Sequence, residues 1–478
     1  GFFQKRIMIF DLNNQKINLD NKEYDIVIIG SGPAGLTIAN RLVNSNLRVL
    51  VAEGGGQQFS IESSNIYKGE VVGDPYYDLT ASRLRYFGGT SNHWTGYCRT
   101  LDEHDFEYKN DYPLAHWPIR KLELTPYLKD ACKIVEISSK FNDSYIDNEF
   151  GIKSFNFNFS PRVRFGEKFE YIFNKSNFDL IRNCNLINFK KEKAKIIQAS
   201  FSSYNAKQLN VNAKKFVLAT GGIENSRLLL ALNQKNNYGL FDRKLPVGKY
   251  WMDHPHFTVG EALSKDEWKD KYLCIDSKSQ RKLKILNCGI RMEGVFEENI
   301  KGKIKEIACY SPQLGKKLFE LANKKLLCNI TIRAAWEQEP LESNRIELSK
   351  SSKDIFGMPR TVLHYKKSKN DLNTVRKTIE QIAKYGIKES IGRIKLKEFV
   401  LGKIDYPVND QLGGPHHIGG TRMSDSPLYG VVDKNAKVFN TDNLYIMGSS
   451  VFPSGGHANP TLTIVQLSLR LGDYLLKS

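Results

Sequence analysis

The chain has 478 residues, of which 41% are hydrophobic and 26% charged, the balance of a globular protein with a large core. This composition excludes collagen, coiled coil and wholesale disorder, and no apolar run approaches the roughly 20 residues of a membrane helix. The formal net charge of +18 would attract polyanions, but the basic residues are scattered and no RNA-binding signature accompanies them. We therefore expect no nucleic-acid partner.

The first strong pattern, at residues 23–55, predicts a strand, a glycine turn, a helix and a second strand. Residues 25–29 form an apolar, β-branched run of strand length. Apolar residues at helical spacing follow the glycines, and residues 47–52 predict a second buried strand. Both strands run parallel in such a unit.

The turn of this unit carries the G-x-G-x-x-G pattern of dinucleotide-binding proteins. Gly30 permits the tight turn, Gly32 lets the backbone approach a pyrophosphate, and Gly35 lets helix and strand pack closely. Pro33 and Ala34 complete the loop that opens the helix. The diphosphate is expected at the helix N-terminus, where free N–H groups favour anions.

Two further features bear on which dinucleotide binds. Glu53 ends the second strand, where a carboxylate accepts hydrogen bonds from a ribose 2′-OH and disfavours a 2′-phosphate. NAD and FAD both use the glycine fingerprint, but the run Ala219-Thr220-Gly221 follows a distant strand, as is typical of large FAD proteins. We therefore expect FAD.

The rest of the chain alternates helical and strand patterns after a loop-rich stretch at residues 56–110. We expect helices at 119–137, 222–232, 370–391 and 459–478, strands in a meander at 180–218, and strands of one antiparallel sheet at 326–366.

The seven cysteines favour a reducing compartment. Their number is odd, their spacings are wide and no C-x-x-C occurs, so we expect no disulfide framework and no metal site. The N-terminal apolar stretch is too short for a signal peptide, and we expect a cytoplasmic protein.

Four blocks of the chain resemble the glucose–methanol–choline (GMC) oxidoreductases. They are DIVIIGSGPAGLTIANRL with VLVAEGG, FGGTSNHWTG (87–96), ATGGIENSRLLL with VGKYWMDHP (247–255), and the long block at 416–464. The blocks cover roughly a third of the chain, in the order of the family, and resemble most the bacterial members and pyranose oxidase. The long block is the most specific.

The resemblance implies a histidine that takes the proton of an alcohol while hydride leaves for flavin N5. A neutral imidazole suits that proton near pH 7. An ungapped match of the block HHIGGTRM puts His416 at this position, whereas the pyranose oxidase form puts His417 there. Asn459 is the implied partner, and the spacing of 43 residues favours His416. Because Asn459 precedes Pro460, it is also expected to cap the last helix.

The resemblance also implies further contacts to FAD. The implied cofactor residues, besides those above, are Gly89, Thr90, Asn92, His93, Trp94, Thr95, Gly448, Ser449, Asn459, Pro460 and Thr461. His93 matches the histidine that carries covalent flavin in some members, so we expect a covalent bond there. His457 is expected either to shape the pocket or to lie in a flexible loop. Tyr310, Trp336, Phe356 and His364 are candidates for either the pocket or the core.

The expected fold is α/β, with a Rossmann-type FAD-binding domain and a substrate-binding domain built on an antiparallel sheet. The FAD-binding domain is expected at 1–110, 178–260 and 412–478, and the substrate-binding domain at 111–177 and 261–411, with the pocket between them.

The expected function is FAD-dependent oxidation of an alcohol group in a sugar, polyol or related compound, with oxygen or another electron acceptor. Two alternatives stay open. One is another flavoenzyme class, such as a monooxygenase or halogenase that uses NAD(P)H. The other is a flavin- or polyanion-binding protein without catalysis.

Overall fold

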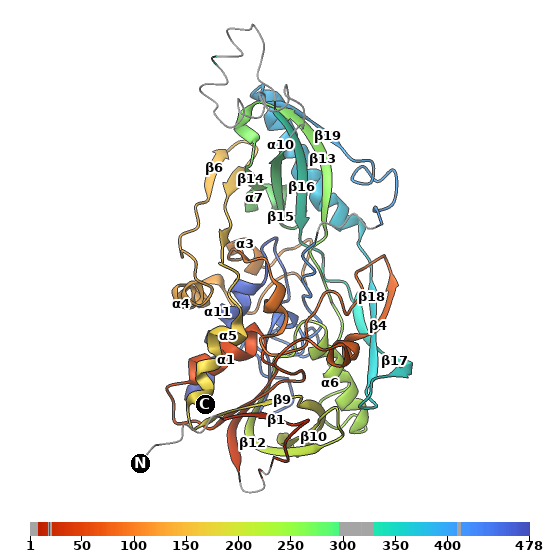
Figure 1. Ribbon diagram of the computed structural model, residues 1–478. Coiled ribbons are helices and arrows are strands. Elements are labelled where there is room, and N and C mark those ends of the chain that lie inside the picture. The colour runs from red at the N-terminus through yellow and green to blue at the C-terminus, as the bar shows by residue number, and fades with distance from the viewer. Residues whose placement is uncertain (1–7, 18, 20–21, 296–316, 318–327, 409–412) are drawn as a thin grey trace.

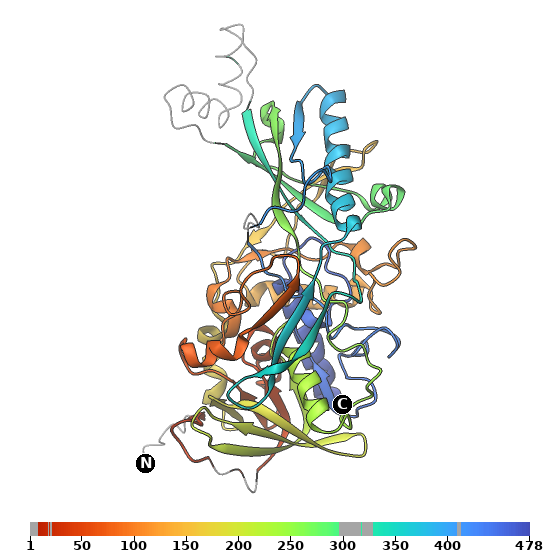
Figure 2. The same cartoon turned by 90° about the vertical axis from the view of Figure 1, so that its right-hand side faces the viewer.

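The computed structural model describes all residues except 1–7, 18, 20–21, 296–316, 318–327 and 409–412. The molecule is elongated, with one large sheet near each end (Figure 1). A quarter turn shows a third, small sheet running alongside the lower half (Figure 2). None of the described helices combines the length and the apolar character needed to cross a membrane.

The lower sheet has eight strands among the described residues. Their order is β1(Ile9–Asp11), β9(Phe178–Arg182), β3(Val49–Ala52), β2(Glu23–Ile29), β12(Gln208–Leu218), β11(Lys195–Ser202) and β10(Asn185–Glu192), with β20(Leu444–Ile446) paired to β12. β2 runs parallel to β3 and to β12, and all residues of β3 are buried, as in sheets covered on both faces. β10, β11 and β12 form an antiparallel meander. The predicted strand–helix–strand unit and the predicted meander are confirmed.

Helices cover this sheet. Helix α1(Pro33–Leu42) packs against the last helix, α11(Thr461–Lys477), where Arg41 and Asp473 form an ion pair at 2.5 Å. Helix α6(Glu224–Lys235) follows β12 and confirms the helix predicted there. The short helices are α2(Ile61–Ser64), α3(Glu103–Phe106), α4(Leu128–Ile134), α5(Phe165–Phe169) and α7(Ser277–Leu283).

The upper sheet has seven strands in the described part of the chain. Their order is β19(Gly392–Leu396), β13(His256–Ser264), β16(Cys328–Trp336), β15(Cys288–Gly294), β14(Tyr272–Ile275), β7(Ile152–Phe155) and β6(Ser144–Asp147), and every pairing is antiparallel. One face is apolar and packs under helix α10(Lys369–Lys388), through side chains such as Ile290, Ile332 and Ile379. The alternation of apolar and polar residues leaves the other face polar, with Arg291 and Arg333 opposite each other.

Two sequence predictions for local structure are wrong. The three strands at 326–366 do not share one sheet, because β17(Arg345–Lys353) pairs with β18(Pro359–Tyr365), and β18 pairs on its other side with β4(Gly69–Gly73). The predicted helix at 119–137 is reduced to α4 preceded by two short 3₁₀ turns, the second of which begins around Pro126, a residue without an N–H donor.

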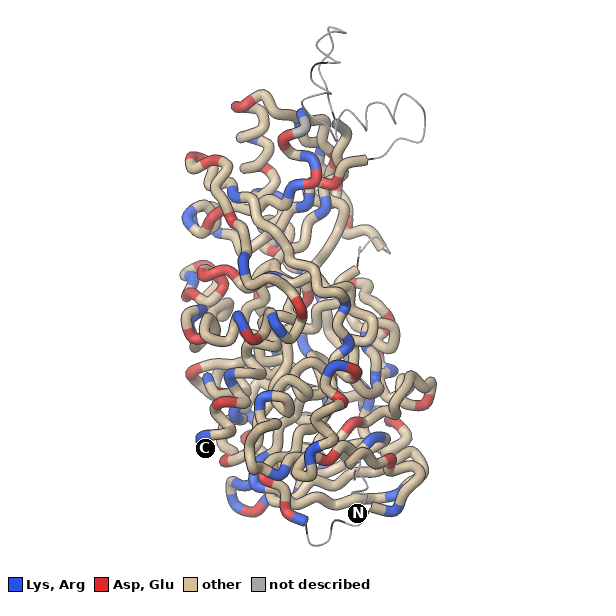
Figure 3. Tube along the Cα trace, turned by 60° about the vertical axis from the view of Figure 1, so that its left-hand side comes forward, with Lys and Arg blue, Asp and Glu red and all other residues tan. Residues whose placement is uncertain are grey.

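The α/β architecture with two large sheets agrees with the predicted fold class. The boundaries of the two domains stay a prediction, and β13 crosses the one expected at residue 260. Lysine, arginine and acidic residues are interspersed along the tube from one end to the other (Figure 3). The net charge is therefore not gathered on one end of the described chain.

The packing of α1 on β2 generates a test of stability. A Cβ at Gly35 would lie 2.0 Å from the carbonyl oxygen of Gly30 and 3.2 Å from Ile28 Cγ2, so Gly35→Ala must push the helix from the strand. We expect the free energy of unfolding to fall by about 1–3 kcal/mol, measured by chemical denaturation of flavin-free protein. Gly32→Ala is the matched control, because no atom lies within 4 Å of its Cβ. Equal stability of the two variants would contradict this assignment.

Candidate active site

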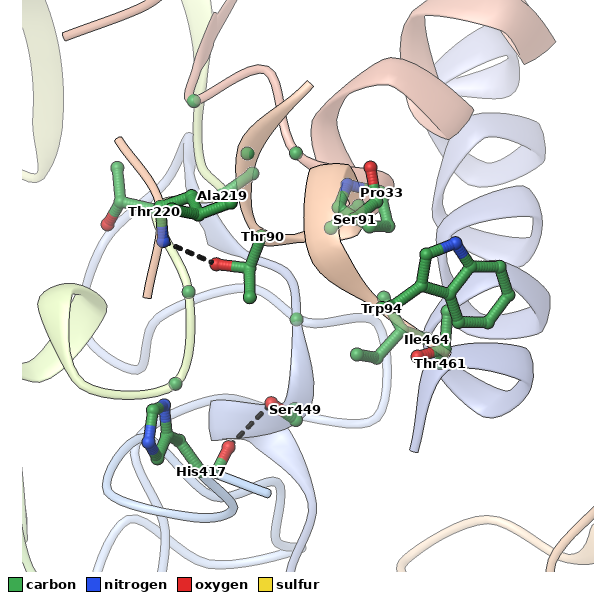
Figure 4. A pocket seen from close by; sticks show the side chains of 18 of the residues that line it. Pro33, Thr90, Ser91, Trp94, Ala219, Thr220, His417, Ser449, Thr461 and Ile464 are labelled. Carbon is green, nitrogen blue, oxygen red and sulfur yellow. Dashed lines mark hydrogen bonds between the residues drawn. The ribbon is translucent and has the colours of Figure 1, made fainter. Parts of the chain in front are cut away.

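A cavity of about 400 Å³ lies where four distant segments of the chain meet. It is bordered by the glycine loop after β2, the segment around residues 89–97, the turn after β12, and the C-terminal segments before α11 (Figure 4). All residues predicted to be catalytic or to bind the cofactor line it, except Gly35 and Asn92. The four blocks that the sequence singled out thus enclose one space.

The three glycines of the first loop have different surroundings. Gly30 has a φ of +107°, and a Cβ there would lie 2.3 Å from the carbonyl oxygen of Ala219. Gly35 packs helix on strand and lies outside the cavity lining, whereas Gly32 faces open space. Gly32 is also the N-cap residue of α1. Because glycine has no side chain, the N–H groups of the first turn, beside Pro33, are not capped by a side chain. The loop can therefore receive an anionic group at the helix N-terminus.

Glu53 lies at the cavity wall with a buried carboxylate. The carboxylate accepts hydrogen bonds from the Ser31 backbone at 3.1 Å, the Ser31 hydroxyl at 2.6 Å and the Gly55 backbone at 2.8 Å. It therefore joins the end of β3 to the glycine loop. Oε2 accepts both bonds from Ser31, whereas Oε1 accepts only from Gly55 and keeps a lone pair for a further donor.

The segment that contains His93 crosses close to the glycine loop. A Cβ at Gly89 would lie 2.9 Å from Gly32 Cα, so only a glycine allows this approach. The side chains of His93, Trp94 and Thr95 line the cavity, as does Thr90. Trp94 and Thr90 are seen on opposite sides of the backbone turn in Figure 4.

Asn92 of the same segment is not brought to the cavity. Its side-chain amide donates to the carbonyl oxygen of Phe87 at 2.9 Å, which holds the turn that precedes it. Its position between cavity-lining neighbours explains why the sequence motif alone suggested a contact.

A buried asparagine connects the ends of two parallel strands at the cavity. The Asn225 side chain accepts from the Thr220 backbone at 2.8 Å and hydroxyl at 2.7 Å, and it donates to the carbonyl oxygen of Met447 at 3.2 Å. A Cβ at Gly221 would meet no atom within 4 Å, and one at Gly448 only the Asn225 amide nitrogen at 3.7 Å. These glycines leave room for a bound group beside Ala219 and Ser449, which also line the cavity.

His416 and Asn459 face each other at the C-terminal side of the cavity. The Asn459 side-chain nitrogen lies 3.4 Å from His416 Nε2. The other ring nitrogen of His416, Nδ1, lies 2.8 Å from Nδ1 of His254. Burial and the neighbouring imidazoles of His254 and His256 lower the pKa of His416 well below its usual value, so its ring is neutral near pH 7.

His417 points away from this pair. Its ring lies beside those of Trp251 and Tyr76, at centroid distances of 6.0 and 6.3 Å, and burial lowers its pKa to about 3. Its carbonyl oxygen accepts the hydroxyl of Ser449 at 2.6 Å, and this contact is drawn in Figure 4. Neighbouring side chains diverge, so only one of the two histidines contacts Asn459.

The predicted helix cap is wrong in one respect. The cap position of α11 is Pro460, and the structure gives it no side-chain hydrogen bond. The Asn459 side chain reaches the ring of His416 instead of the helix amides. Pro460 and Thr461 line the cavity, so the start of α11 still borders it.

The remaining candidates lie elsewhere. His457 is buried, with its ring 4.7 Å from that of Phe155 and its Nε2 3.6 Å from an Asp102 oxygen, and it does not line the cavity. Trp336 is fully buried in the core of the upper sheet, Phe356 packs on the lower core, and His364 contacts Glu347. Tyr310 lies outside the described residues.

The sequence reading missed several residues at the site. Tyr67 and Arg85 line the cavity, Arg85 beside Gly54, and both come from a stretch that showed only loop character. His254 and Asp253 stand in the matched block WMDHP, but no role was drawn from it. The block itself was the only signal for them.

The comparisons with known proteins agree with these observations. Residues 340–468 match the family model described as GMC oxidoreductase. The chain is 27% identical over 303 residues to the fructose dehydrogenase large subunit of Gluconobacter japonicus, covering 59% of this chain and 51% of that protein. It is 23% identical to 2-methyl-1,2-propanediol dehydrogenase of Mycolicibacterium austroafricanum, covering 94% of this chain and 95% of that protein.

Solved structures share the fold. Pyridoxine 4-oxidase from Mesorbium loti matches with a TM-score of 0.58 and 14% identity, covering 95% of this chain and all of that one. A variant of Aspergillus oryzae formate oxidase, studied for FAD modification, matches with a TM-score of 0.55 and 15% identity, covering 96% and 99%.

The open space at Gly32 generates a test of cofactor binding. In Gly32→Val the branched side chain would occupy the space in front of the α1 N-terminus, where the diphosphate is expected. We expect the purified variant to be colourless, with an unfolding midpoint equal to that of flavin-free wild type. The absorbance of bound flavin measures this outcome. Full flavin content in the variant would show that the diphosphate lies elsewhere.

Proposed function

We propose that this chain, which belongs to the GMC oxidoreductase family, oxidises an alcohol group of a small molecule with FAD as cofactor. The observation that carries the proposal is the His416–Asn459 pair, which borders the same cavity as the glycine loop. A cofactor that binds along this cavity would have its diphosphate at the glycine loop and its redox end beside a neutral imidazole.

The residues present fit FAD. Glycines at positions 32, 221 and 448 leave space at the wall, and Glu53 offers the remaining lone pair of Oε1 for the adenosine ribose. The start of α11 would direct its N–H groups at the flavin pyrimidine end, which favours negative charge there. FAD supplies a two-electron acceptor that takes the hydrogen of the alcohol carbon as hydride.

His416 would act as the general base in this reaction. Its neutral ring can accept the hydroxyl proton at Nε2, and the Asn459 amide can donate a hydrogen bond to the same substrate oxygen. Together they would hold the hydroxyl group and orient the carbon to be oxidised. His417, packed against Trp251, would contribute only to the wall.

The substrate class is a sugar, polyol or related hydroxyl compound. The relatives named above are a fructose dehydrogenase subunit and a diol dehydrogenase, which favours a hydroxyl-rich substrate here. The electron acceptor is oxygen or another acceptor. We propose that the substrate enters between the FAD-binding and substrate-binding domains, and that the protein acts in the cytoplasm.

The alternative flavoenzyme classes have less support. A monooxygenase or halogenase would use NAD(P)H and would not need the paired His416 and Asn459. A flavin-binding protein without catalysis would not need a neutral base beside the cavity. Reduction of the bound flavin by an alcohol, and not by NADPH, separates these functions.

The role of His416 is tested by comparing it with its neighbour. In His416→Ala we expect flavin reduction by an active alcohol to slow by ~10² to 10⁴-fold with FAD content unchanged, because a positioned base is lost. His417→Ala is the matched control and should keep most of the rate. Rapid-mixing measurement of anaerobic flavin bleaching with sugars and polyols gives both values. If only His417→Ala slows flavin reduction, the base is His417. If neither variant slows it, the mechanism is refuted.

We also propose that His93 bonds covalently to the flavin. Its imidazole is exposed at the cavity wall and makes no hydrogen bond within the described residues. Burial and the nearby Arg164 lower its pKa, which keeps a ring nitrogen free for bond formation. After acid precipitation of wild type the flavin should stay with the protein, whereas His93→Ala should release it into the supernatant. Release of the flavin from wild-type protein would contradict a covalent bond.

A further inference from the structure

His254 takes part in a series of three contacts that connects the loop before α11 to His416 and Asn459. Its Nε2 lies 3.3 Å from the carbonyl oxygen of Gly455, and its Nδ1 lies 2.8 Å from Nδ1 of His416. On the far side of His416, Nε2 lies 3.4 Å from the side-chain nitrogen of Asn459. The four groups form one continuous chain of hydrogen bonds.

We infer that His254 is a positioning residue that holds His416 in the tautomer with its proton on Nδ1 and an unprotonated Nε2. This inference rests on the proposed function, because it explains how His416 is prepared to act as a base. Nothing in the family match or in the relatives' names assigns a role to His254.

The contact with Gly455, at one end of this series of hydrogen bonds, determines the tautomer of His254. A carbonyl oxygen only accepts hydrogen bonds, so His254 Nε2 must carry the proton that is donated to Gly455. Burial, together with the nearby His457 and His256, lowers the pKa of His254 to about 4, so its ring is neutral. A neutral ring with a proton on Nε2 has a lone pair on Nδ1.

The contact between the two imidazole rings then determines the tautomer of His416. Two ring nitrogens 2.8 Å apart need one proton between them, and His254 Nδ1 can only accept. His416 Nδ1 must therefore donate, and Nε2 of its neutral ring is left unprotonated. The opposite pair of tautomers would direct the N–H of His416 toward Asn459.

The contact with Asn459, at the other end of the series of hydrogen bonds, independently selects the same tautomer of His416. The amide nitrogen of Asn459 only donates, so the ring nitrogen of His416 that faces it must accept. A donor at one end and a carbonyl acceptor at the other leave one arrangement of protons that satisfies all three contacts. This agreement is the main support for the inference.

The buried carboxylate of Asp253 fixes the position of the two histidines relative to each other. One oxygen of Asp253 accepts the backbone N–H of His254 at 2.6 Å and that of His416 at 2.7 Å. The other oxygen accepts the hydroxyl of Tyr76 at 2.6 Å. The rings of the two histidines meet edge to face, at a centroid distance of 5.0 Å and an interplanar angle of 82°. The backbone of both histidines is thus held by one group.

The test compares two substitutions at His254. His254→Leu removes the acceptor, and we expect flavin reduction to slow by ~10²-fold because the base then populates the wrong tautomer. His254→Asn can place its side-chain oxygen near the position of Nδ1 and accept from His416, so we expect it to be at least ~10-fold faster than the leucine variant. Flavin content and unfolding midpoint of both variants control for misfolding.

A spectroscopic measurement reports the tautomer without any substrate. In holoenzyme labelled with ¹⁵N-histidine, the signals of His416 are assigned by their loss in His416→Gln. We expect a protonated Nδ1 and an unprotonated Nε2 in wild type and in His254→Asn, and a mixture of tautomers in His254→Leu.

The outcomes separate this inference from the proposed function. A protonated Nε2 in wild type, equal rates in wild type and His254→Leu, or equal losses in both variants would overturn the role of His254. If no alcohol reduces the flavin of wild type, the proposed function fails, whereas the tautomer measured by NMR still decides the inference.

Discussion

Close approach of backbones, made possible by glycine, is the constraint on which the rest of the structure depends. At Gly30 the turn after β2 touches the carbonyl of Ala219, and at Gly89 a third segment lies against Gly32. At Gly222 a Cβ would collide with the backbone of His417 at 2.1 Å. Side chains at these positions would separate the segments, and the residues that they carry would no longer face one cavity.

Burial has opposite consequences for the acids and the histidines at this site. It lowers the pKa of His416, His254 and His417, because the charged ring loses hydration, and it raises the pKa of Asp253 to about 7. The three histidines are therefore neutral over the range where most enzymes work. A neutral imidazole is a base only if its lone pair faces the substrate, so the hydrogen bonds around the ring matter as much as its pKa.

The sequence predicts the part of this site that depends on local patterns. Strand, glycine loop and helix at the N-terminus, and the last helix, follow from patterns whose spacing has a physical reason. Most of the predicted residues that line the cavity are instead implied by the resemblance to a family. The pairing of β18 with β4 could not be predicted, because it joins strands almost 300 residues apart and their alternating pattern suits any half-buried sheet. Likewise, the choice between His416 and His417 depends on side-chain direction, which Asn459 and Trp251 reveal only in three dimensions.

The small sheet that the sequence failed to predict has a direct connection to the base. Its strands bury Ile346, Leu363 and Tyr365 in a cluster with Trp251. Tyr76 packs on the same cluster, edge to face with Trp251 and Tyr365, and donates its hydroxyl to Asp253. Asp253 in turn holds the backbone of His254 and His416. The packing of a peripheral sheet is thus transmitted through one aromatic ring and one carboxylate to the imidazole beside the cavity. Because each contact in this series is buried, a shift of the small sheet would displace His416 from Asn459 without touching either residue.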